Sequence, residues 1–344
     1  MGLIKKNSIV LAPMAEISDK PFRTMCRKYG ADFTFTEMVS ARGIVNNSFN
    51  TTRKVVFAKS EQPIGIQLLG SSPFYIGEAV KRLVKFSPVD FDLNAGCPVK
   101  KVTKNGFGAA ILDNPAQLKE IVSAMKKSAG DIPVSVKMRL GFRKVTILEN
   151  AKICEGEGAD FITLHPKMGN DGSELLPDRE WIGKVKSVVN IPVLANGFVF
   201  SAEDAVALLN ETDADGVMVA RGALGNPYLF SRYNHYLRTK TFPEKPKIDQ
   251  VFTDALEHLE LIKIEYGENL VGLNSAKKNI FWYFKRFNGI FSLIENIMEL
   301  QKFNRIKIEL EKHVENLKAG KFSTESNEEV FEKFKQRILF WNLK

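Results

Sequence analysis

The stretch VDFDLNAGCPVKKVTKNGFGAAIL, residues 89–112, joins a short strand-like run to a polar turn. Residues 89–93 have the length and apolar content of a buried β-strand. The turn Asn-Ala-Gly-Cys-Pro follows at once, and Asn114-Pro115 then pairs a capping residue with a proline that a first helical turn accepts. The stretch therefore predicts a strand, a turn that carries the Cys97 thiol, and a helix.

The same alternation recurs along the first two thirds of the chain. Further helix starts are marked at Asp19-Lys20-Pro21, Ser72-Pro73 and Ser201. The strand-like runs lie at residues 8–12, 32–36, 64–69, 89–93, 133–138, 160–164, 191–195 and 216–220. Eight such alternations over about 230 residues are typical of a closed (β/α)8 TIM barrel. A doubly wound parallel sheet is the alternative within the α/β class.

The strand-like runs stop after Arg238. Residues 241–247, TFPEKPK, have the composition of a linker, and the remainder is rich in helix formers with helical periodicity. We expect a TIM-barrel catalytic domain at residues 1–240 and a C-terminal all-helical domain at residues 245–344.

Charge and cysteine content restrict the possible partners and compartment. The chain of 344 residues has a formal net charge of +9, and residues 1–240 hold eight of these nine charges, which favours a polyanionic partner. Three cysteines are too few for a disulfide framework and too scattered for a metal site. The first apolar run is cut by Pro13, which fits neither a signal peptide nor a spanning helix. We expect a cytoplasmic protein with no metal and no membrane segment.

Polar or conformationally special residues cluster where the predicted strands end. In a TIM barrel these positions form the catalytic face. They are Pro13, Met14, Ala15, Gln67, Asn94, Cys97, Lys137, Arg139, His165, Asn196, Gly197, Arg221 and Gly222.

Lys137 and His165 end neighbouring predicted strands. A lysine within a barrel strand is costly to bury unless an anion or strong acceptor meets it, and a bound cofactor would supply one. The alternative is a lysine that reaches solvent at the strand end. His165 alone would more often be a core histidine, but its position facing Lys137 favours a functional role.

The loops after the last two strands, Asn196-Gly197 and Ala220-Arg221-Gly222, occupy the usual phosphate site of this fold. They combine accessible backbone N–H groups with one guanidinium, so they predict a cofactor that carries a phosphate. Glycine in a turn can also serve backbone geometry alone.

The three cysteines occupy different settings. Cys26 and Cys154 fall on apolar stripes of predicted helices and are most simply core residues. Cys97 sits in a Gly-Cys-Pro turn on the expected catalytic face, where a reactive thiol could reach a ligand.

Together these residues resemble the tRNA-dihydrouridine synthases, flavin-dependent enzymes that reduce selected uridines in tRNA. The resemblance covers nearly the whole chain and is most specific in LNAGCP followed by KNGFGAAIL. The other matching motifs are LAPMAEISDKPFR, GIQLLGSSP, VSVKMRLGF, ITLHPK, IPVLANG, GVMVARGALGNPYLF and the C-terminal NSAKKNIFWYFKRF.

The resemblance implies a site and a chemistry. Hydride would pass from reduced flavin to uracil C6, and Cys97 as general acid would deliver a proton to C5. Asn94 and Arg139 would lie beside the uracil or the flavin, and NADPH would be the electron donor, although no dinucleotide fingerprint is present. The residues expected to hold FMN are Pro13, Met14, Ala15, Gln67, Lys137, His165, Asn196, Gly197, Phe198, Ala220 and Arg221.

The resemblance also places tRNA-binding residues in the helical domain. The segment AKKNIFWYFKRF at 276–287 has four cations, Lys277, Lys278, Lys285 and Arg286, no acid, and interleaved aromatic residues. Further basic candidates are Arg53, Lys54, Lys81, Arg82, Lys85, Lys100, Lys101 and Lys104. A solvated basic face is the alternative for each residue alone.

Several positions depart from the family pattern. Glu16, Phe198 and Ala220 stand where the family usually has Gly, Asp and Gly, and the loop at 166–181 differs most after His165. Two other functions remain open at this point. One is an FMN barrel oxidoreductase for a small molecule, similar to dihydroorotate dehydrogenase, and the other is a tRNA-binding factor without chemistry. Flavin content separates the second from both enzymes.

Overall fold

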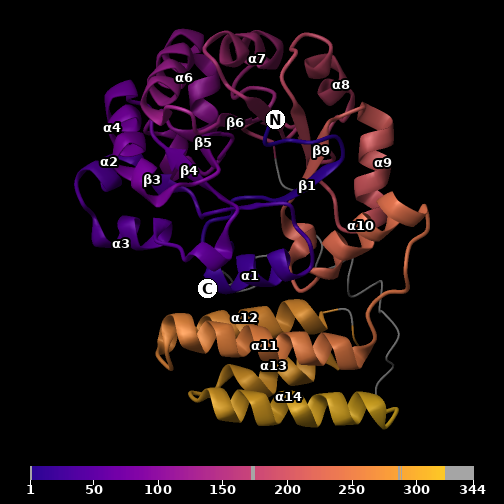
Figure 1. The fold of residues 1–344 in the computed structure, drawn as a ribbon. Coiled ribbons are helices and arrows are strands. Elements are labelled where there is room, and N and C mark those ends of the chain that lie inside the picture. Colours follow the sequence, from indigo (N-terminus) through magenta and orange to yellow (C-terminus); the bar gives the residue numbers. More distant parts are fainter. Residues whose placement is uncertain (1, 172–174, 286, 288, 322–344) are drawn as a thin grey trace. The chain divides into compact units, whose positions relative to one another are not determined.

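The first part of the chain is a closed parallel β-barrel surrounded by helices (Figure 1). The computed structural model describes residues 2–171, 175–285, 287 and 289–321. The strands are β1 (Ser8–Leu11), β2 (Thr34–Phe35), β3 (Val39–Ser40), β4 (Ile64–Leu69), β5 (Asp90–Ala95), β6 (Val134–Met138), β7 (Phe161–Leu164), β8 (Val193–Asn196) and β9 (Gly216–Val219). Pairing runs from β1 through β9 back to β4, and β2 pairs with both β1 and β4, which closes the barrel. The predicted TIM barrel is confirmed.

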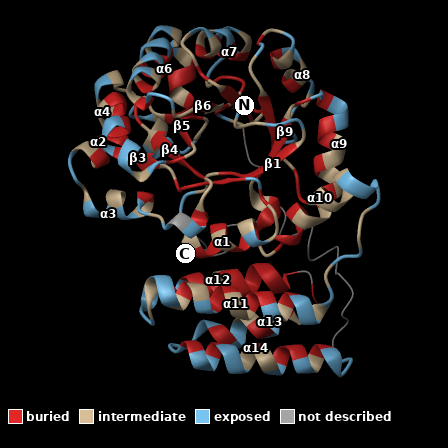
Figure 2. Ribbon diagram, in the orientation of Figure 1, coloured by how far each residue is buried: buried red, intermediate tan, exposed pale blue. Residues whose placement is uncertain are grey.

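Each of the predicted strand runs overlaps one barrel strand, and β3 is an additional short strand. Val39 and Ser40 pair only with the end of β4, so β3 lies beside the ring. The strands are buried along almost their whole length, as expected for a parallel sheet covered on both faces (Figure 2). The barrel interior is packed with Val10, Ala12, Phe33, Phe35, Phe161, Leu194 and Met218.

Helices cover the outside of the barrel. They are α1 (Lys20–Lys28), α2 (Ala41–Val45), α3 (Phe49–Thr52), α4 (Pro73–Leu83), α5 (Lys100–Thr103), α6 (Pro115–Ala129), α7 (Ile147–Gly156), α8 (Glu180–Lys186) and α9 (Ala202–Thr212). The predicted caps are present: Asp19, Ser72, Asn114 and Ser201 each accept a hydrogen bond from a first-turn N–H. These bonds satisfy donors that the helix itself leaves unpaired.

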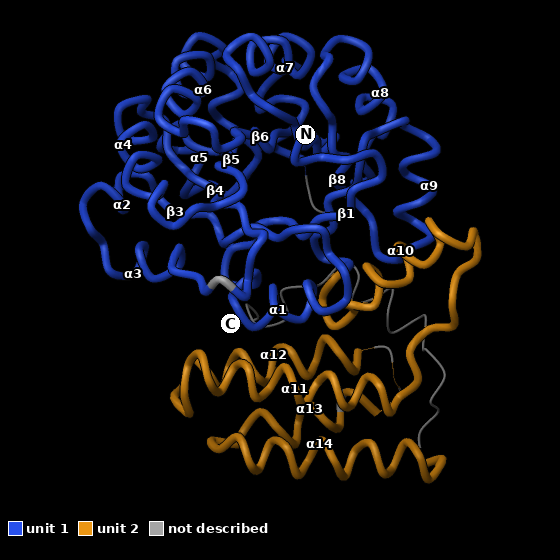
Figure 3. The backbone as a smooth tube through the Cα atoms, viewed as in Figure 1, with its two compact units in different colours: residues 1–222 blue, residues 223–344 orange. Residues whose placement is uncertain are grey.

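Backbone contacts divide the chain into two compact units, Met1–Gly222 and Ala223–Lys344 (Figure 3). The described helices of the second unit are α10 (Tyr228–Thr239), α11 (Ile248–Tyr266), α12 (Leu270–Phe284), α13 (Ile290–Met298) and α14 (Phe303–Lys318). The predicted boundary between 240 and 245 falls in the irregular segment that follows α10, and it stays a prediction. Residues 322–344 of the predicted helical domain lie outside the described residues.

Close packing of α12 on the segment before α10 holds the second unit together. Gly225 has φ +63, and a Cβ there would lie 2.1 Å from the Trp282 carbonyl group, so a side chain cannot be accommodated. The buried Tyr228 hydroxyl donates a hydrogen bond to Asp254 Oδ2 (2.9 Å), which ties α10 to α11. No helix among the described residues is both long and apolar enough to span a bilayer.

Candidate active site

Two adjoining cavities open at the carboxyl ends of the barrel strands. One, of about 210 Å³, is lined by residues that follow β1, β8 and β9, including Asn196, Phe198 and Arg221. The other, of about 230 Å³, is lined by Gln67, Asn94, Cys97 and Arg139 among others. Pro13, Lys137 and His165 line both, so the cavities are two halves of one site.

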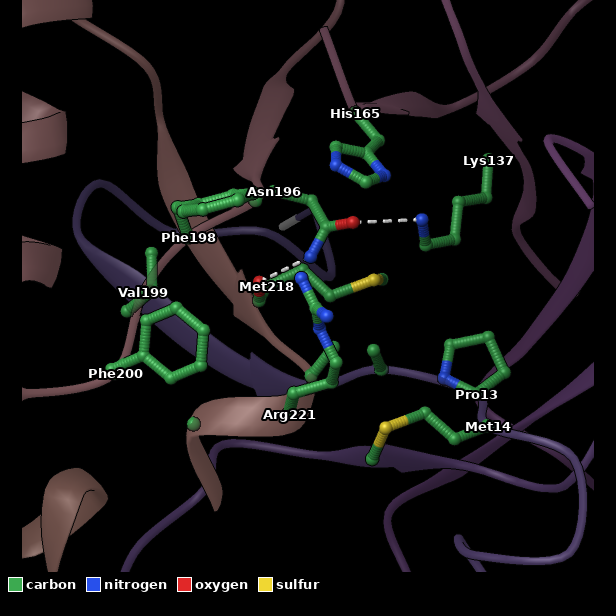
Figure 4. Close-up of a pocket in the computed structure, with 14 residues that line it drawn as sticks. Pro13, Met14, Lys137, His165, Asn196, Phe198, Val199, Phe200, Met218 and Arg221 are labelled. Atoms are coloured by element: carbon green, nitrogen blue, oxygen red, sulfur yellow. Dashed lines mark hydrogen bonds between the residues drawn. The ribbon is translucent and has the colours of Figure 1, made fainter. Parts of the chain in front are cut away.

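Lys137 lines both halves of the site, and Figure 4 shows it beside Asn196 in the first. Its Nζ donates a hydrogen bond to Asn196 Oδ1 (2.8 Å), and Asn196 Nδ2 donates to the Met218 carbonyl (2.7 Å). Burial lowers the pKa of Lys137 to about 8, while the Asp92 carboxylate opposes that change. The ammonium group is therefore charged at neutral pH and poised to meet an anion or a strong acceptor.

His165 is a neutral ring at neutral pH. Burial, followed by the charges of Lys137, Arg139, Lys167 and Arg221, lowers its pKa well below the ordinary value. Its Nε2 is buried and has no hydrogen-bond partner among the described residues. Buried polar atoms are normally hydrogen-bonded, so this nitrogen is suited to bind a ligand that supplies the missing partner.

The backbone of Gly197 approaches the His165 ring closely. A Cβ at Gly197 would lie 2.8 Å from His165 Cδ2, and the φ of +125 is one that residues with a Cβ rarely adopt. The glycine thus leaves room for the ring at the edge of the cavity. The sequence predicted both residues as ligand contacts, and the packing explains why they occur together.

Arg221 also lines the first cavity. Its guanidinium carbon lies 5.6 Å from the ring centroid of Phe198 and 5.9 Å from that of Phe200. Gly222 follows it, and a Cβ there would lie 1.9 Å from the Val199 carbonyl oxygen. The two aromatic rings fix a cation beside a backbone with no side chain, which is an arrangement suited to an anionic group.

The Cys97 turn is held from both sides. Asn94 Oδ1 accepts hydrogen bonds from the Cys97 N–H (2.9 Å) and the Gly96 N–H (3.2 Å). The Cys97 carbonyl accepts one from the Ala109 N–H (3.0 Å), and Gly108, with φ +60, packs so closely that its Cβ would lie 2.5 Å from that oxygen. The GFGAAIL run after the turn therefore serves to fix Cys97, which is half-buried and lines the second cavity.

Arg139 shares the second cavity with Cys97. Its Nη1 donates a hydrogen bond to the Met168 carbonyl (2.6 Å), which orients the side chain. Burial lowers the pKa of Arg139, and Asp171 opposes this change. A guanidinium group and a thiol therefore line the same space.

The family model described as Dihydrouridine synthase (Dus) matches residues 10–319. The chain belongs to the dihydrouridine synthase family. It is 36% identical over 323 residues to the probable tRNA-dihydrouridine synthase 1 of Synechocystis sp., covering 92% of this chain and 90% of that protein.

Other family members show similar identity. The tRNA-dihydrouridine synthase B of Pseudomonas putida is 34% identical, over 85% of this chain and 88% of that protein. Its counterpart in Pasteurella multocida is 33% identical, over 90% and 96%. Among solved structures, a variant of NCR from Zymomonas mobilis matches with a TM-score of 0.51 and 14% identity, over 72% of this chain and 91% of that one. That structural likeness shows the shared fold.

The predicted barrel-site residues gather at the cavities, whereas the described lysines predicted to contact tRNA have contacts within the helical unit. The cavity walls include Pro13, Met14, Ala15, Gln67, Asn94, Cys97, Lys137, Arg139, His165, Asn196, Gly197, Phe198, Ala220 and Arg221. Lys277 and Lys285 are buried, and their Nζ atoms donate hydrogen bonds to the carbonyls of Met298 (2.6 Å) and Leu224 (3.0 Å). Lys278 is half-buried with its Nζ 5.2 Å from the Trp282 ring centroid, and Arg286 lies outside the described residues.

Some site residues were missed at the sequence level. Met38, Val199, Phe200 and Met218 line the cavities without a polar signal that would single them out. Asp90 and Asp92 did carry a signal, because two carboxylates in a run predicted to be buried need partners. They alternate with Asn94 along β5 and so share its face.

Proposed function

We propose that this protein is a tRNA-dihydrouridine synthase that reduces the 5,6 double bond of uridines in tRNA. Family membership and the curated relatives support this activity. The observation that carries the proposal is the thiol of Cys97 on the same cavity as Lys137 and His165. A proton donor beside a cationic ligand site is what reduction of a conjugated double bond requires.

The cofactor of the proposed reaction is a flavin, and specifically FMN. Two observations fit it: the His165 Nε2, which has no hydrogen-bond partner among the described residues, and the guanidinium of Arg221 on the wall of the first cavity. Arg221 would hold the phosphate, while Lys137 and Asn196 would meet the ring system. When bound and reduced, the flavin supplies the hydride, and NADPH is the proposed source of its electrons.

The chain's own residues divide the remaining tasks. Lys137 places a positive charge where negative charge develops on the ligand. Cys97 holds a proton on Sγ for delivery to C5 of uracil, which requires the thiol to be protonated before transfer. Asn94 and Arg139 are proposed to contact the uracil ring, since both line the cavity that holds Cys97.

A uridine must leave its stack in tRNA to enter this cavity, and basic surface must offset that cost. Lys100, Lys101 and Lys104 are exposed and belong to the segment directly after the Cys97 turn. They are proposed to contact the phosphate backbone near the extruded base. In the helical unit, Lys278 is a stronger candidate for RNA contact than Lys277 or Lys285, because Lys278 is only half-buried whereas the other two are buried.

The test is anaerobic reoxidation. The bound flavin is reduced, unmodified tRNA is added, and the visible absorbance is followed over time. Rapid reoxidation that depends on tRNA is expected. A reduced flavin that ignores several unmodified tRNAs would favour a small-molecule oxidoreductase, and a purified protein without flavin would favour an RNA-binding factor.

A further inference from the structure

A chain of buried polar side chains crosses three barrel strands and ends at the Cys97 turn. Gln67 on β4, Asp92 on β5 and Ser135 on β6 are register partners, so they lie side by side in one row. Ser135 Oγ lies 2.7 Å from Asp92 Oδ1, and Gln67 Nε2 donates a hydrogen bond to Asp92 Oδ2 (2.6 Å). Asn94 Nδ2 then donates to Gln67 Oε1 (2.9 Å).

The hydrogen positions in this row of side chains follow from a count of donors and acceptors. Ser135 Oγ also lies 2.7 Å from Asp90 Oδ2, yet its hydroxyl has one hydrogen and can donate to only one carboxylate. The other contact therefore needs a protonated carboxyl group. Asp90 is the protonated one, because its Oδ1 is buried with no partner among the described residues, whereas both oxygens of Asp92 are paired.

The charged groups around the two carboxyls agree with this assignment. Burial, then the Asp92 charge, raises the pKa of Asp90 well above its ordinary value, and Lys126 opposes the effect of Asp160 nearby. Burial raises the pKa of Asp92 to about 6, against the hydrogen bonds from Gln67 and Ser135 and the charge of Lys137. At neutral pH, Asp92 is thus the anion and accepts from both neighbours.

The Asp92 anion orients each amide beyond it. With two acceptor oxygens toward its neighbours, it forces Gln67 to present its NH2 group, which turns the Gln67 oxygen toward Asn94. Asn94 must then present its own NH2 group to Gln67, which turns its oxygen toward the N–H groups of Gly96 and Cys97. A flip of either amide would place donors against donors.

We propose that Asp92 is a positioning residue for Cys97, acting through the amides of Gln67 and Asn94 to fix the turn that carries the thiol. The proposal rests on the proposed function, because that function gives the reason for holding the thiol in place. It gives Asp92 a role although Asp92 itself lines neither cavity.

The test compares two aspartates on the same strand. Asp92→Ala removes the acceptor that orients Gln67, whereas Asp90→Ala leaves Ser135 free to donate to Asp92 and so keeps the chain intact. Both variants lose a fully buried carboxyl group of the same size, so the cavities that they leave should be similar. Asp92→Asn is the conservative rescue, since its oxygen can accept from Gln67 while its NH2 group can donate to Ser135.

The readout is the alkylation rate of Cys97 by iodoacetamide across pH, with the site assigned by mass spectrometry on the full-length protein. Cys26 and Cys154 are fully buried, so Cys97 dominates the reaction in the folded state. Asp92→Ala should change the rate by about fivefold, as expected when one hydrogen bond of ordinary net strength is lost. Asp90→Ala and Asp92→Asn should stay within about twofold of the unaltered protein.

Flavin content is measured on the same samples, and alkylation is repeated with excess FMN, so that a lost cofactor does not mimic a displaced thiol. If Asp92→Ala does not fold, Gln67→Leu breaks the same link and should produce the same change. Equal Cys97 rates in folded Asp92→Ala and Asp90→Ala, or in Gln67→Leu and the unaltered protein, would overturn the proposal. Because alkylation needs no tRNA, a failure of uridine reduction would leave this result interpretable.

Discussion

Lysine ammonium groups donate hydrogen bonds to different kinds of acceptor at the barrel mouth and in the helical unit. Lys137 donates to the side-chain amide of Asn196 on a cavity wall, and it remains partly exposed to that cavity. Lys277 and Lys285 are buried and donate to backbone carbonyls within the helical unit. A cation in a functional motif therefore serves either a ligand or the fold, and the side chain's burial or its position on a cavity wall distinguishes the two.

The cysteines differ in the same way, because Cys97 lines a cavity whereas Cys154 is buried in the fold. Substitution of Cys97 has the largest expected effect on turnover. Cys97→Ala should lower turnover on unmodified tRNA by about a hundredfold to ten-thousandfold, the usual contribution of a general acid, while flavin content stays unchanged. Cys154→Ala, in the fully buried core of α7, is the matched control and should lower stability with little change in turnover. The measurement is single-turnover reoxidation of the reduced flavin. Full turnover in Cys97→Ala would remove the acid role.

The depressed pKa of Lys137 predicts a second large effect, on stability against pH. The pKa is about 8 in the folded protein and ordinarily 10.5. Between these values the unfolded chain binds more protons, so stability rises with pH there, by up to about 3 kcal/mol. Urea unfolding of the flavin-free protein at several pH values measures this rise.

Lys137→Met is the control for this pH window. It lacks the titrating group, so its stability should not show the rise through the window. Identical pH profiles for the two proteins would mean that the folded pKa of Lys137 is not lowered.

Flavin retention should separate Lys137 from Lys277. Lys137→Met should weaken FMN binding by about tenfold, the cost of one charge-assisted hydrogen bond, as measured by fluorescence titration of the flavin-free protein. Lys277→Met should leave that affinity unchanged and lower stability by about 1–2 kcal/mol, because the Met298 carbonyl loses its donor. Equal effects of the two substitutions on flavin affinity would contradict the assignment of Lys137 to the ligand and of Lys277 to the fold.

Local signals in the sequence were sufficient to predict many of the strands and helix starts of the barrel. Ser201 and Asp204 form a capping box within four residues, and Asn114-Pro115 begins α6 as its spacing indicates. The site residues at strand ends were predictable because parallel strands bring their carboxyl ends to one face. The family motif then specified which of these residues face the cavity.

Contacts between residues far apart in the sequence could not be predicted from such local signals. The acceptors of Lys277 and Lys285 lie 21 and 61 residues away, so the basic motif alone could not show that these side chains are buried. The Asp92–Ser135 contact, at a separation of 43 residues, depends on the register of β5 against β6. Sequence periodicity gives the face of a strand, whereas hydrogen-bond partners across the sheet require the register.

The smallest expected effect concerns RNA binding by α12. Lys278→Glu should weaken tRNA affinity by a few-fold and lower the slope of log affinity against log salt by about 0.7–0.9 for the lost phosphate contact. Lys285→Met, whose cation is used by the Leu224 carbonyl, should leave that slope unchanged. Filter binding or fluorescence anisotropy at several salt concentrations makes the comparison, with circular dichroism to show that both variants fold. If the slope falls equally in both, Lys285 contacts RNA after a rearrangement, and burial would no longer identify a structural cation.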